Sequence, residues 1–295
     1  MKEYSTDPLV AKPETPLLRP ASRSWRASAL MRVSAGMHAG ALGTLIFAPR
    51  AWPGVLGAIA ADHLTVVGAG LLPRSAWLGP VLVRLPGPAE ARREIALTFD
   101  DGPDPATTPR ILDLLEARAA RSTFFCIGRR VEERPELAAE IVRRGHRVEN
   151  HSYRHPAGFW FLPPAALRAE IERGQEAIAG AAGRAPRLFR APAGIRSPLL
   201  EPALAQAGLD LVAWTRRGFD TVTGKSEAVL GRLLRGLSPG DILLLHDRAA
   251  RRTASGSPVV LEVLPRLLDA IDAAGLKPVP LGPPAPGLER LPAAR

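Results

Sequence analysis

Hydrophobic and polar residues alternate in blocks along the second two thirds of the chain, and the blocks have the lengths of strands and helices. Helices are expected between the apolar runs, and three of them begin at a Ser or Thr followed by Pro, at Thr108, Ser197 and Ser257. The apolar runs that we predict to be strands are residues 95–100, 122–127, 146–150, 187–190, 210–215, 241–246 and 276–280. Strand and helix in alternation predict an α/β fold with a parallel sheet, either a barrel or a doubly wound sheet.

Two longer hydrophobic segments precede this pattern. Residues 33–49 and 54–72 are apolar or small almost throughout, and each is near the lower length limit for crossing a bilayer. We therefore predict an N-terminal helical hairpin over residues 29–73 that associates with a membrane. The alternative is a pair of soluble helices packed on the barrel. Asp62 and His63 favour that alternative, because ionisable groups at mid-membrane are costly.

The remaining segments are shorter and more polar. Residues 1–28 are rich in Pro and Arg and are predicted to be a disordered tail. Residues 74–93 are predicted to be a linker, 94–281 the α/β domain, and 282–295 a Pro-rich tail.

The flanks of the hairpin indicate its orientation. Three arginines lie between residues 19 and 26 and four between residues 74 and 93, whereas Arg50 alone lies in the turn. The positive-inside rule then predicts a protein of the bacterial inner membrane with its catalytic domain facing the cytoplasm. The alternative is a domain that faces the periplasm.

The charge and cysteine content add little to this assignment. The net charge is +10, and only four of the 39 basic residues are lysine. The arginines are spread along the chain without a basic block or interleaved aromatics, so we expect no nucleic-acid partner. Attraction to anionic lipid headgroups remains an alternative. Cys126 lies in an apolar run and is predicted to be a buried core residue.

Polar residues with catalytic chemistry fall at the ends of the predicted strands. Asp100 and Asp101 end the first strand, and His151 follows the third with His155 four residues later. One carboxylate and two imidazoles form a three-ligand set typical of a catalytic metal site. Two histidines at this spacing can lie on one helical face. Further candidates follow later strands: Arg190, Asp220 and His246. In barrels and open α/β sheets the active site lies at the carboxyl ends of the strands.

These residues occur in motifs that resemble the polysaccharide deacetylase family, carbohydrate esterase family 4. The pattern Thr-Phe-Asp-Asp-Gly is intact at 98–102, and His-Ser-x-x-His is intact at 151–155. Arg-x-Pro-x-Gly occurs at 190–194 and Leu-x-His at 244–246, whereas a further motif that normally ends in Asp-Trp is altered to Phe-Asp-Thr at 219–221. The resemblance implies a deformed (β/α)7 barrel of parallel strands with an open groove for a sugar chain. It also implies a membrane-anchored bacterial member, because some members carry such anchors.

The resemblance also implies a role for each candidate. Asp101, His151 and His155 would hold a divalent metal, for which family and ligand type favour Zn²⁺, with Co²⁺, Mn²⁺ or Fe²⁺ as alternatives. Asp100 would be the general base, Arg190 its partner and His246 the general acid. The backbone N–H of Ala193 would be the oxyanion donor. Asp220 would orient His246. Trp214 and Leu244 would form walls of the acyl pocket.

The function implied is hydrolysis of an N-acyl group from an amino-sugar glycan or a lipid-linked sugar. Membrane lipids would be contacted by the hairpin, and no protein partner is implied. Two alternatives belong to other classes. A catalytically inactive glycan-binding or membrane scaffold protein would lack one of the key groups. A metal phosphoesterase would require a second metal site, and the sequence shows no further Asp/His cluster.

Overall fold

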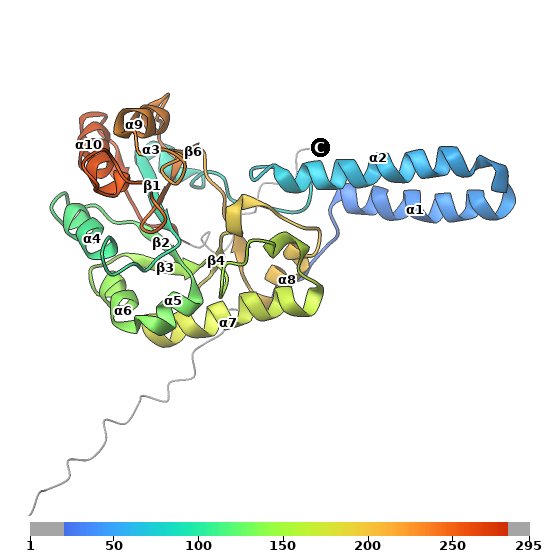
Figure 1. The fold of residues 1–295 in the computed structure, drawn as a ribbon, viewed down its shortest axis with the longest axis horizontal. Helices are drawn as coiled ribbons and strands as arrows, with labels where there is room; N and C mark the ends of the chain where they lie inside the picture. Colours follow the sequence, from blue (N-terminus) through green and yellow to red (C-terminus); the bar gives the residue numbers. More distant parts are fainter. Residues whose placement is uncertain (1–20, 283–295) are drawn as a thin grey trace, which may run out of the picture.

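The computed structural model describes residues 21–282, and eight strands of one parallel sheet form its centre. The sheet order is β5-β4-β3-β2-β1-β7-β6, with β8 also paired to β1. The strands are β1 Glu94–Asp100, β2 Thr123–Cys126, β3 Arg147–Asn150, β4 Leu188–Phe189, β5 Asp210–Leu211, β6 Arg216–Arg217, β7 Ile242–His246 and β8 Lys277–Pro278. The parallel α/β sheet predicted from the strand pattern and the (β/α)7-like barrel implied by the resemblance are both confirmed, with the sheet curled into an incomplete barrel (Figure 1).

Helices cover the outer face of the curled sheet, as Figure 1 shows. The sequence signals locate three of them to within a few residues, since α4, α8 and α10 begin at or shortly after the predicted Ser/Thr-Pro starts. The helices of the barrel are α4 Thr108–Glu116, α5 Gly128–Glu133, α6 Pro135–Arg143, α7 Pro164–Ala182, α8 Leu200–Ala207, α9 Ser226–Leu234 and α10 Val259–Ala273. Two short 3-10 helices, η2 Phe159–Phe161 and η3 Pro192–Gly194, lie in loops that follow β3 and β4.

Strand alternation divides the side chains of β1 and β7 between two environments. Leu97 and Phe99 of β1 pack outward in the large core beneath the helices, whereas Ala96 belongs to the smaller cluster inside the barrel. Asp100 shares the parity of Ala96, and in the parallel register it lies opposite His246 at the end of β7. The same alternation that builds the core therefore places two polar side chains together at one end of the barrel.

Two parts of the strand assignment differ from the prediction. The run 210–215 was expected to be one strand, but β5 ends at Leu211 and the chain then crosses to form β6, which pairs with β7. The segment 74–93, expected to be a linker, contains the short helix α3 (Pro88–Ala91) and pairs with the barrel at two points. Leu82 bridges Val212 beyond β5, and Arg84 bridges Asp241 before β7. The segment thus connects the two sides of the curled sheet.

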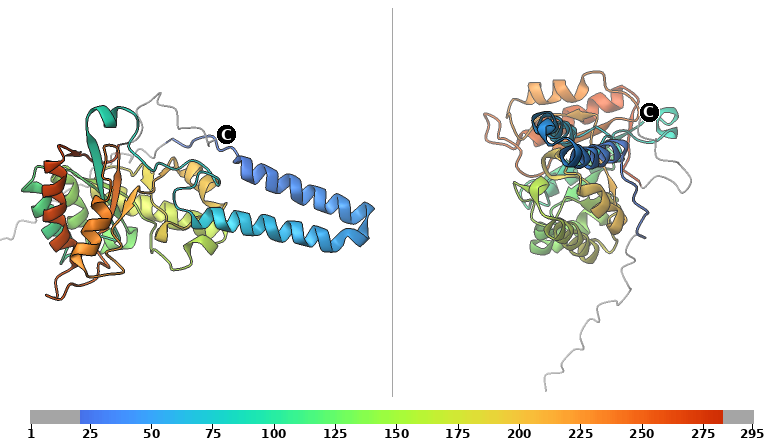
Figure 2. Two further views of the ribbon diagram at one scale, coloured as in Figure 1. Left: turned by 90° about the horizontal axis from the view of Figure 1, so that it is seen from above. Right: turned by 90° about the vertical axis from the view of Figure 1, so that its right-hand side faces the viewer.

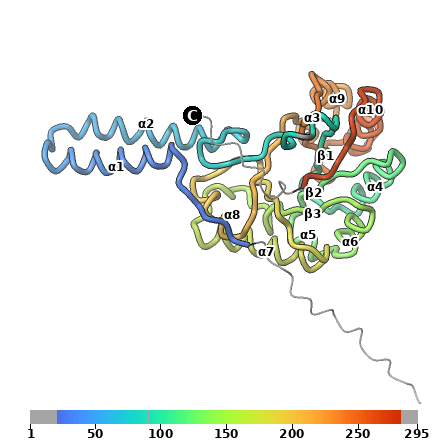
Figure 3. Tube along the Cα trace, turned by 180° about the vertical axis from the view of Figure 1, so that it is seen from behind, coloured from blue at the N-terminus to red at the C-terminus, as the bar shows by residue number. Residues whose placement is uncertain are grey.

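The hydrophobic hairpin consists of α1 (Ala29–Phe47), the 3-10 turn η1 (Pro49–Ala51) and α2 (Trp52–Leu71). Figures 1 and 3 show it projecting from the side of the barrel that carries α8, away from α9 and α10. In both views of Figure 2 the two helices lie side by side. Both are long and apolar enough to cross a membrane by length and composition.

Polar residues join the two helices halfway along the hairpin. Ser34 Oγ donates a hydrogen bond to Asp62 (2.7 Å), and the Nε2 atoms of His38 and His63 lie 3.2 Å apart. His38, Asp62 and His63 form a group that the sequence analysis did not anticipate, because the helices bring together residues about 25 positions apart. These contacts satisfy groups that would otherwise be costly at the middle of a bilayer.

The predicted N-terminal tail falls mostly outside the described residues, as does nearly all of the C-terminal one. Of the N-terminal tail, residues 21–28 are described, and they contact the barrel through Arg23. The Arg23 backbone N–H donates to the carbonyl of Ala205, and its guanidinium donates to the carbonyl of Leu209. This end of the predicted tail is therefore fixed beside α8.

Candidate active site

The first two site residues are positioned by the end of β1. Asp100 is the last residue of the strand and is buried, and Asp101 follows with a positive φ of 77°. This turn directs the two neighbouring carboxylates differently. Asp100 remains inside the barrel opposite His246, while Asp101 extends toward the loop after β3.

Asp101, His151 and His155 come together as the sequence predicts. Asp101 Oδ1 lies 3.4 Å from His151 Nε2 and 3.5 Å from His155 Nε2. All three ligand atoms lie within 4.8 Å of one another. This spacing fits three ligands on one divalent ion, since Zn–N and Zn–O bonds are about 2.0–2.2 Å long.

The interpretation that the two histidines share a helical face is wrong. Residues 151–155 form an irregular loop after β3, in which Ser152 and His155 have positive φ values of 64° and 56°. Ser152 Oγ accepts a hydrogen bond from the His155 backbone N–H (3.0 Å). The curled loop, and not helical periodicity, brings the two rings within 4.8 Å of each other, centroid to centroid.

The hydrogen bond of His151 leaves one of its ring nitrogens free for a metal. His151 Nδ1 lies 2.8 Å from the carbonyl oxygen of Arg190. Nδ1 must carry the proton to donate to this carbonyl, so Nε2, which faces Asp101, is the ring nitrogen that can bind a metal once its own proton is lost. Burial works to raise the pKa of Asp101, but the contact with His151 outweighs burial and holds this pKa well below its ordinary value. The carboxylate is therefore ionised and suited to bind a cation.

Arg190 and Asp100 form a buried ion pair. Arg190 Nη1 lies 2.7 Å from Asp100 Oδ1 and 2.8 Å from Thr98 Oγ1, and Nη2 donates to the carbonyl of Ala213. The guanidinium also stacks over the ring of Phe125 at 4.1 Å. A guanidinium held by four neighbours fixes both the charge and the orientation of the carboxylate.

Asp220 lies directly against His246. One carboxylate oxygen accepts from the His246 backbone N–H (2.8 Å), and the other lies 2.9 Å from Nδ1 of the ring. Burial works to lower the pKa of His246, but the Asp220 carboxylate outweighs it and raises this pKa to about 9. His246 is thus an imidazolium at neutral pH, and Nε2 remains free to donate a proton.

A cavity of about 230 Å³ opens among these groups. Trp214 and Leu244, predicted to wall the acyl pocket, both line it, as does Ala193 of η3. The φ of Ala193 is positive (56°), so the chain turns sharply at this residue. The sequence analysis missed other residues that line the cavity, among them Arg217 and Thr221. Arg217 lies in β6, the strand that the apolar pattern did not reveal.

Asp247 is a buried residue that the sequence analysis also missed. It accepts a hydrogen bond from Thr108 Oγ1 (2.5 Å), and its N–H donates to the carbonyl of Asp100. Burial raises the pKa of Asp247 to about 7, against the opposing effect of Thr108. The sequence signal that could have identified Asp247 is its position directly after the motif histidine, His246. Asp247 connects the start of α4 with the end of β1 beneath the site.

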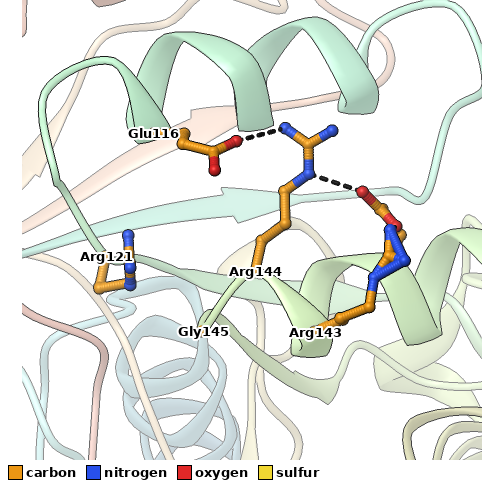
Figure 4. A pocket seen from close by; sticks show the side chains of 6 residues that line it. Glu116, Arg121, Arg143, Arg144 and Gly145 are labelled. Atoms are coloured by element: carbon orange, nitrogen blue, oxygen red, sulfur yellow. Dashed lines mark hydrogen bonds and ion pairs between the residues drawn. The ribbon is translucent and has the colours of Figure 1, made fainter.

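A second depression lies among helices and loops at the opposite ends of the strands. Its lining residues are Glu116, Arg121, Glu140, Arg143, Arg144 and Gly145. Figure 4 shows Arg144 at its centre, and its guanidinium is paired with Glu116 (3.0 Å) and Glu140 (2.6 Å). The depression is therefore lined by a surface ion-pair network.

Comparisons with known proteins agree with the site. Residues 88–212 match the family model described as polysaccharide deacetylase. A chitooligosaccharide deacetylase of a Bradyrhizobium species is 38% identical over 162 residues, which are 55% of this chain and 74% of that protein. A peptidoglycan-N-acetylglucosamine deacetylase of Bacillus cereus is 33% identical over 175 residues, covering 59% of this chain and 81% of that protein.

Solved structures are similar as well. A family 4 carbohydrate esterase from Streptomyces lividans, in complex with acetate, superimposes with a TM-score of 0.58 and 33% identity. The match covers 67% of this chain and 95% of that one. Motifs, fold and relatives agree, and the chain belongs to the polysaccharide deacetylase family.

Proposed function

We propose that this protein is a metal-dependent N-deacylase that removes an acetyl group from an amino sugar. The observation that carries the proposal is that two sets of residues line one cavity. The first set is the candidate metal ligands Asp101, His151 and His155, and the second is the proposed base Asp100 and the proposed acid His246. The family supports the same reaction, because the similar proteins are named as deacetylases of chitooligosaccharides or of peptidoglycan N-acetylglucosamine.

The three ligand atoms would hold a divalent ion, and their two nitrogens and one carboxylate oxygen suit zinc best. When bound, such an ion supplies Lewis-acid polarisation of the amide carbonyl and lowers the pKa of water. Co²⁺, Mn²⁺ or Fe²⁺ accept the same donors, so the metal content of the purified protein decides among them.

Asp100 takes the proton of the attacking water. Its carboxylate is inside the cavity and is held at Oδ1 by Arg190, so Oδ2 is free to accept a proton. Oδ2 lies 3.9 Å from His151 Nε2, a distance that supports its role as a base next to the proposed metal position. Arg190 orients this carboxylate and keeps it ionised.

His246 delivers the proton that the departing amine needs. As water adds to the amide carbon, negative charge develops on the carbonyl oxygen, and the backbone N–H of Ala193 is the proposed donor to it. The C–N bond then breaks while the imidazolium Nε2 protonates the nitrogen. The products are acetate and a free amino sugar, and Asp220 stabilises the charged imidazole before transfer.

The hairpin of α1 and α2 is the proposed membrane anchor. Only 6% and 11% of the residues in its two apolar windows are buried, which distinguishes these helices from core helices of a soluble domain. With the arginines on its outer flanks, the hairpin would hold the barrel at the cytoplasmic face of the inner membrane. The substrate is then an N-acylated amino sugar, either a free glycan or a sugar joined to a lipid.

Acetate release with metal analysis tests the reaction. The full-length protein, purified in detergent with its native metal, is assayed on tetra-N-acetylchitotetraose and on an N-acetylglucosamine lipid. Asp101→Ala is expected to lose metal and activity together. Asp100→Asn is expected to keep its metal but to lose at least about 100-fold in kcat, since a positioned general base contributes roughly 10²–10⁴-fold.

Asp269→Asn is the matched control, because Asp269 pairs with Arg118 on the exposed surface. This variant should retain both metal and turnover. Wild-type protein that binds metal but releases no acetate from either substrate would contradict the proposed reaction. Unchanged turnover in Asp100→Asn would contradict the assignment of the base.

A further inference from the structure

The end of α2 is in direct contact with the loop that contains Ala193. The carbonyl of Gly70, in the last turn of α2, accepts a hydrogen bond from the Arg196 backbone N–H (3.0 Å). The approach is so close that a Cβ atom added to Gly70 would lie 2.3 Å from the Arg196 carbonyl oxygen. The guanidinium of Arg196, itself nearly fully buried, donates to the carbonyl of Ser75 just beyond the helix.

A second contact lies one residue from Ala193. A Cβ atom on Gly194 would meet Pro73 at 3.1 Å and the Trp214 ring at 2.5 Å. Gly194 and Trp214 both line the catalytic cavity. The chain that leaves α2 therefore packs against the loop that carries Ala193.

With α2 as part of the proposed membrane anchor, its length would put this contact at a membrane surface. Its 20 residues rise by about 1.5 Å each, or ~30 Å in total, which is about the thickness of the hydrocarbon core. Trp52 at the distal end and Trp25 and Trp77 at the barrel end are all exposed, as expected of aromatic residues at the two interfaces. Because Pro73 packs against Gly194, which lines the cavity, the cavity would then lie close to the interface nearer the barrel.

The exposed apolar side chains of the barrel favour the same placement. From β1 onward, five large hydrophobic residues are exposed among the described residues, and four lie in segments that follow the carboxyl ends of strands. They are Phe161 after β3, Leu199 after β4, and Phe219 and Val222 after β6. Apolar side chains exposed in loops at the end of the barrel that carries the cavity are suited to contact lipid.

We propose that the enzyme works on the membrane surface, on an N-acylated amino sugar joined to a lipid, and that α2 serves as a positioning element of the active site. This inference rests on the proposed deacylase function and names its substrate class. A lipid-linked sugar confined to the bilayer would reach the cavity at a high effective concentration. A glycan in solution would gain nothing from the hairpin.

The substrate test uses the full-length protein with its native metal in nanodiscs. Three probes carry the same acetyl group: N-acetylglucosamine linked through a diphosphate to a polyprenol in the disc, the soluble nucleotide sugar UDP-N-acetylglucosamine, and tetra-N-acetylchitotetraose. We expect the lipid-linked probe to release acetate at least about tenfold faster at equal concentration, because the bilayer confines it beside the cavity.

Equal rates of acetate release from the lipid-linked and the soluble nucleotide probes would overturn the inference. The diphosphate that both probes carry would then account for recognition without the lipid. Acetate from the tetraose alone would also overturn it while leaving the deacylase function intact. Acetate from none of the three, with metal bound, would overturn the deacylase function and the inference with it.

The positioning role of α2 is tested with two glycines of the same helix. Gly70→Ala forces the loop away, and we expect kcat to fall by about 10²-fold, the typical cost of losing one oxyanion donor, with little change in KM. Gly68→Ala is the matched control, because a Cβ there meets nothing within 4 Å. Arg196→Gln, which removes the bond to Ser75, should shift kcat in the same direction. Metal content verifies folding, and equal kcat in Gly70→Ala and Gly68→Ala would overturn the positioning role.

Discussion

At the scale of single residues, the site depends on charges that are buried and paired. Asp100 at the end of β1 and Arg190 after β4 are both buried and form an ion pair, and each would lose its closest opposite charge without the other. Removing one partner of such a pair is far more costly than removing a surface ion pair, because the remaining charge stays uncompensated in a medium of low polarity.

We therefore expect Arg190→Met to lower the free energy of unfolding by about 3–5 kcal/mol. Denaturant titration of the full-length protein in detergent, followed by tryptophan fluorescence, measures this loss. Arg118→Met removes an exposed partner of Asp269 and should cost at most about 1 kcal/mol. Similar losses in the two variants would show that the buried pair does not have the importance assigned to it.

Asp220 is expected to set the alkaline limit of activity. The proposed general acid, His246, must be protonated to act, and its pKa is raised to about 9, so kcat/KM should fall as the pH rises through about 9. Asp220→Asn removes the negative charge that favours the imidazolium. The pKa of His246 should then fall, and the alkaline limb should move down toward or below the ordinary imidazole value of about 6.5.

The pH dependence of kcat/KM for the wild type, Asp220→Asn and the surface control Asp269→Asn measures this shift. The control should reproduce the wild-type alkaline limb. An unshifted alkaline limb in Asp220→Asn would assign the alkaline limit to another group. It would mean that the hydrogen bond between Asp220 and His246 does not control the pKa that limits activity.

At the scale of elements, neighbouring strand ends must approach closely for the site to form. β1 and β7 end side by side, and their loops touch at Gly102 and Asp247. A Cβ atom on Gly102 would lie 2.0 Å from Asp247 Oδ2. Only glycine allows the loop that carries Asp101 to pass over this buried carboxyl.

Gly102→Ala should therefore displace Asp101 and weaken metal binding by about tenfold or more, the effect typical of disturbing residues that support metal ligands. Calorimetric titration of the metal-stripped protein with Zn²⁺ measures the dissociation constant. Gly158→Ala, where a Cβ meets nothing within 4 Å, is the control. An unchanged dissociation constant in Gly102→Ala would mean that the loop accommodates the methyl group without moving the ligand.

At the scale of the whole molecule, the protein is a barrel attached to a long apolar hairpin (Figure 1). The hairpin contacts the barrel beside the catalytic cavity, and arginines lie on the barrel side of both helices. The proposed anchor and the catalytic cavity therefore adjoin, and the orientation of the hairpin in a membrane would decide which compartment receives the released acetate.

The positive-inside rule predicts a cytoplasmic barrel. Alkaline phosphatase, which is active only in the periplasm, should be inactive when fused after Arg295 and active when fused in the turn at Arg50. A cytoplasmic reporter such as green fluorescent protein at Arg295 should give the complementary signal. Active phosphatase at Arg295 would place the barrel in the periplasm and make envelope glycans accessible to it.

The sequence by itself determined the strands, the hairpin and the three metal-ligand candidates, because these depend on local patterns. Apolar runs of strand length located seven of the eight strands, and long apolar segments marked α1 and α2. The intact motif at 98–102 and the pair of histidines at 151 and 155 identified the family from residue types and spacing alone.

Only the tertiary structure decided the contacts between segments that are distant in sequence. Strand β6 has too few apolar residues to be seen as a strand, and its pairing with β7 brings Arg217 to the cavity. The bond between Asp220 and His246 depends on how the chain returns to β7, and the contact between Gly70 and Arg196 depends on where the hairpin meets the barrel. Local sequence propensity does not predict such contacts, because they form only when the curled sheet brings the strand ends, the loops and the hairpin together.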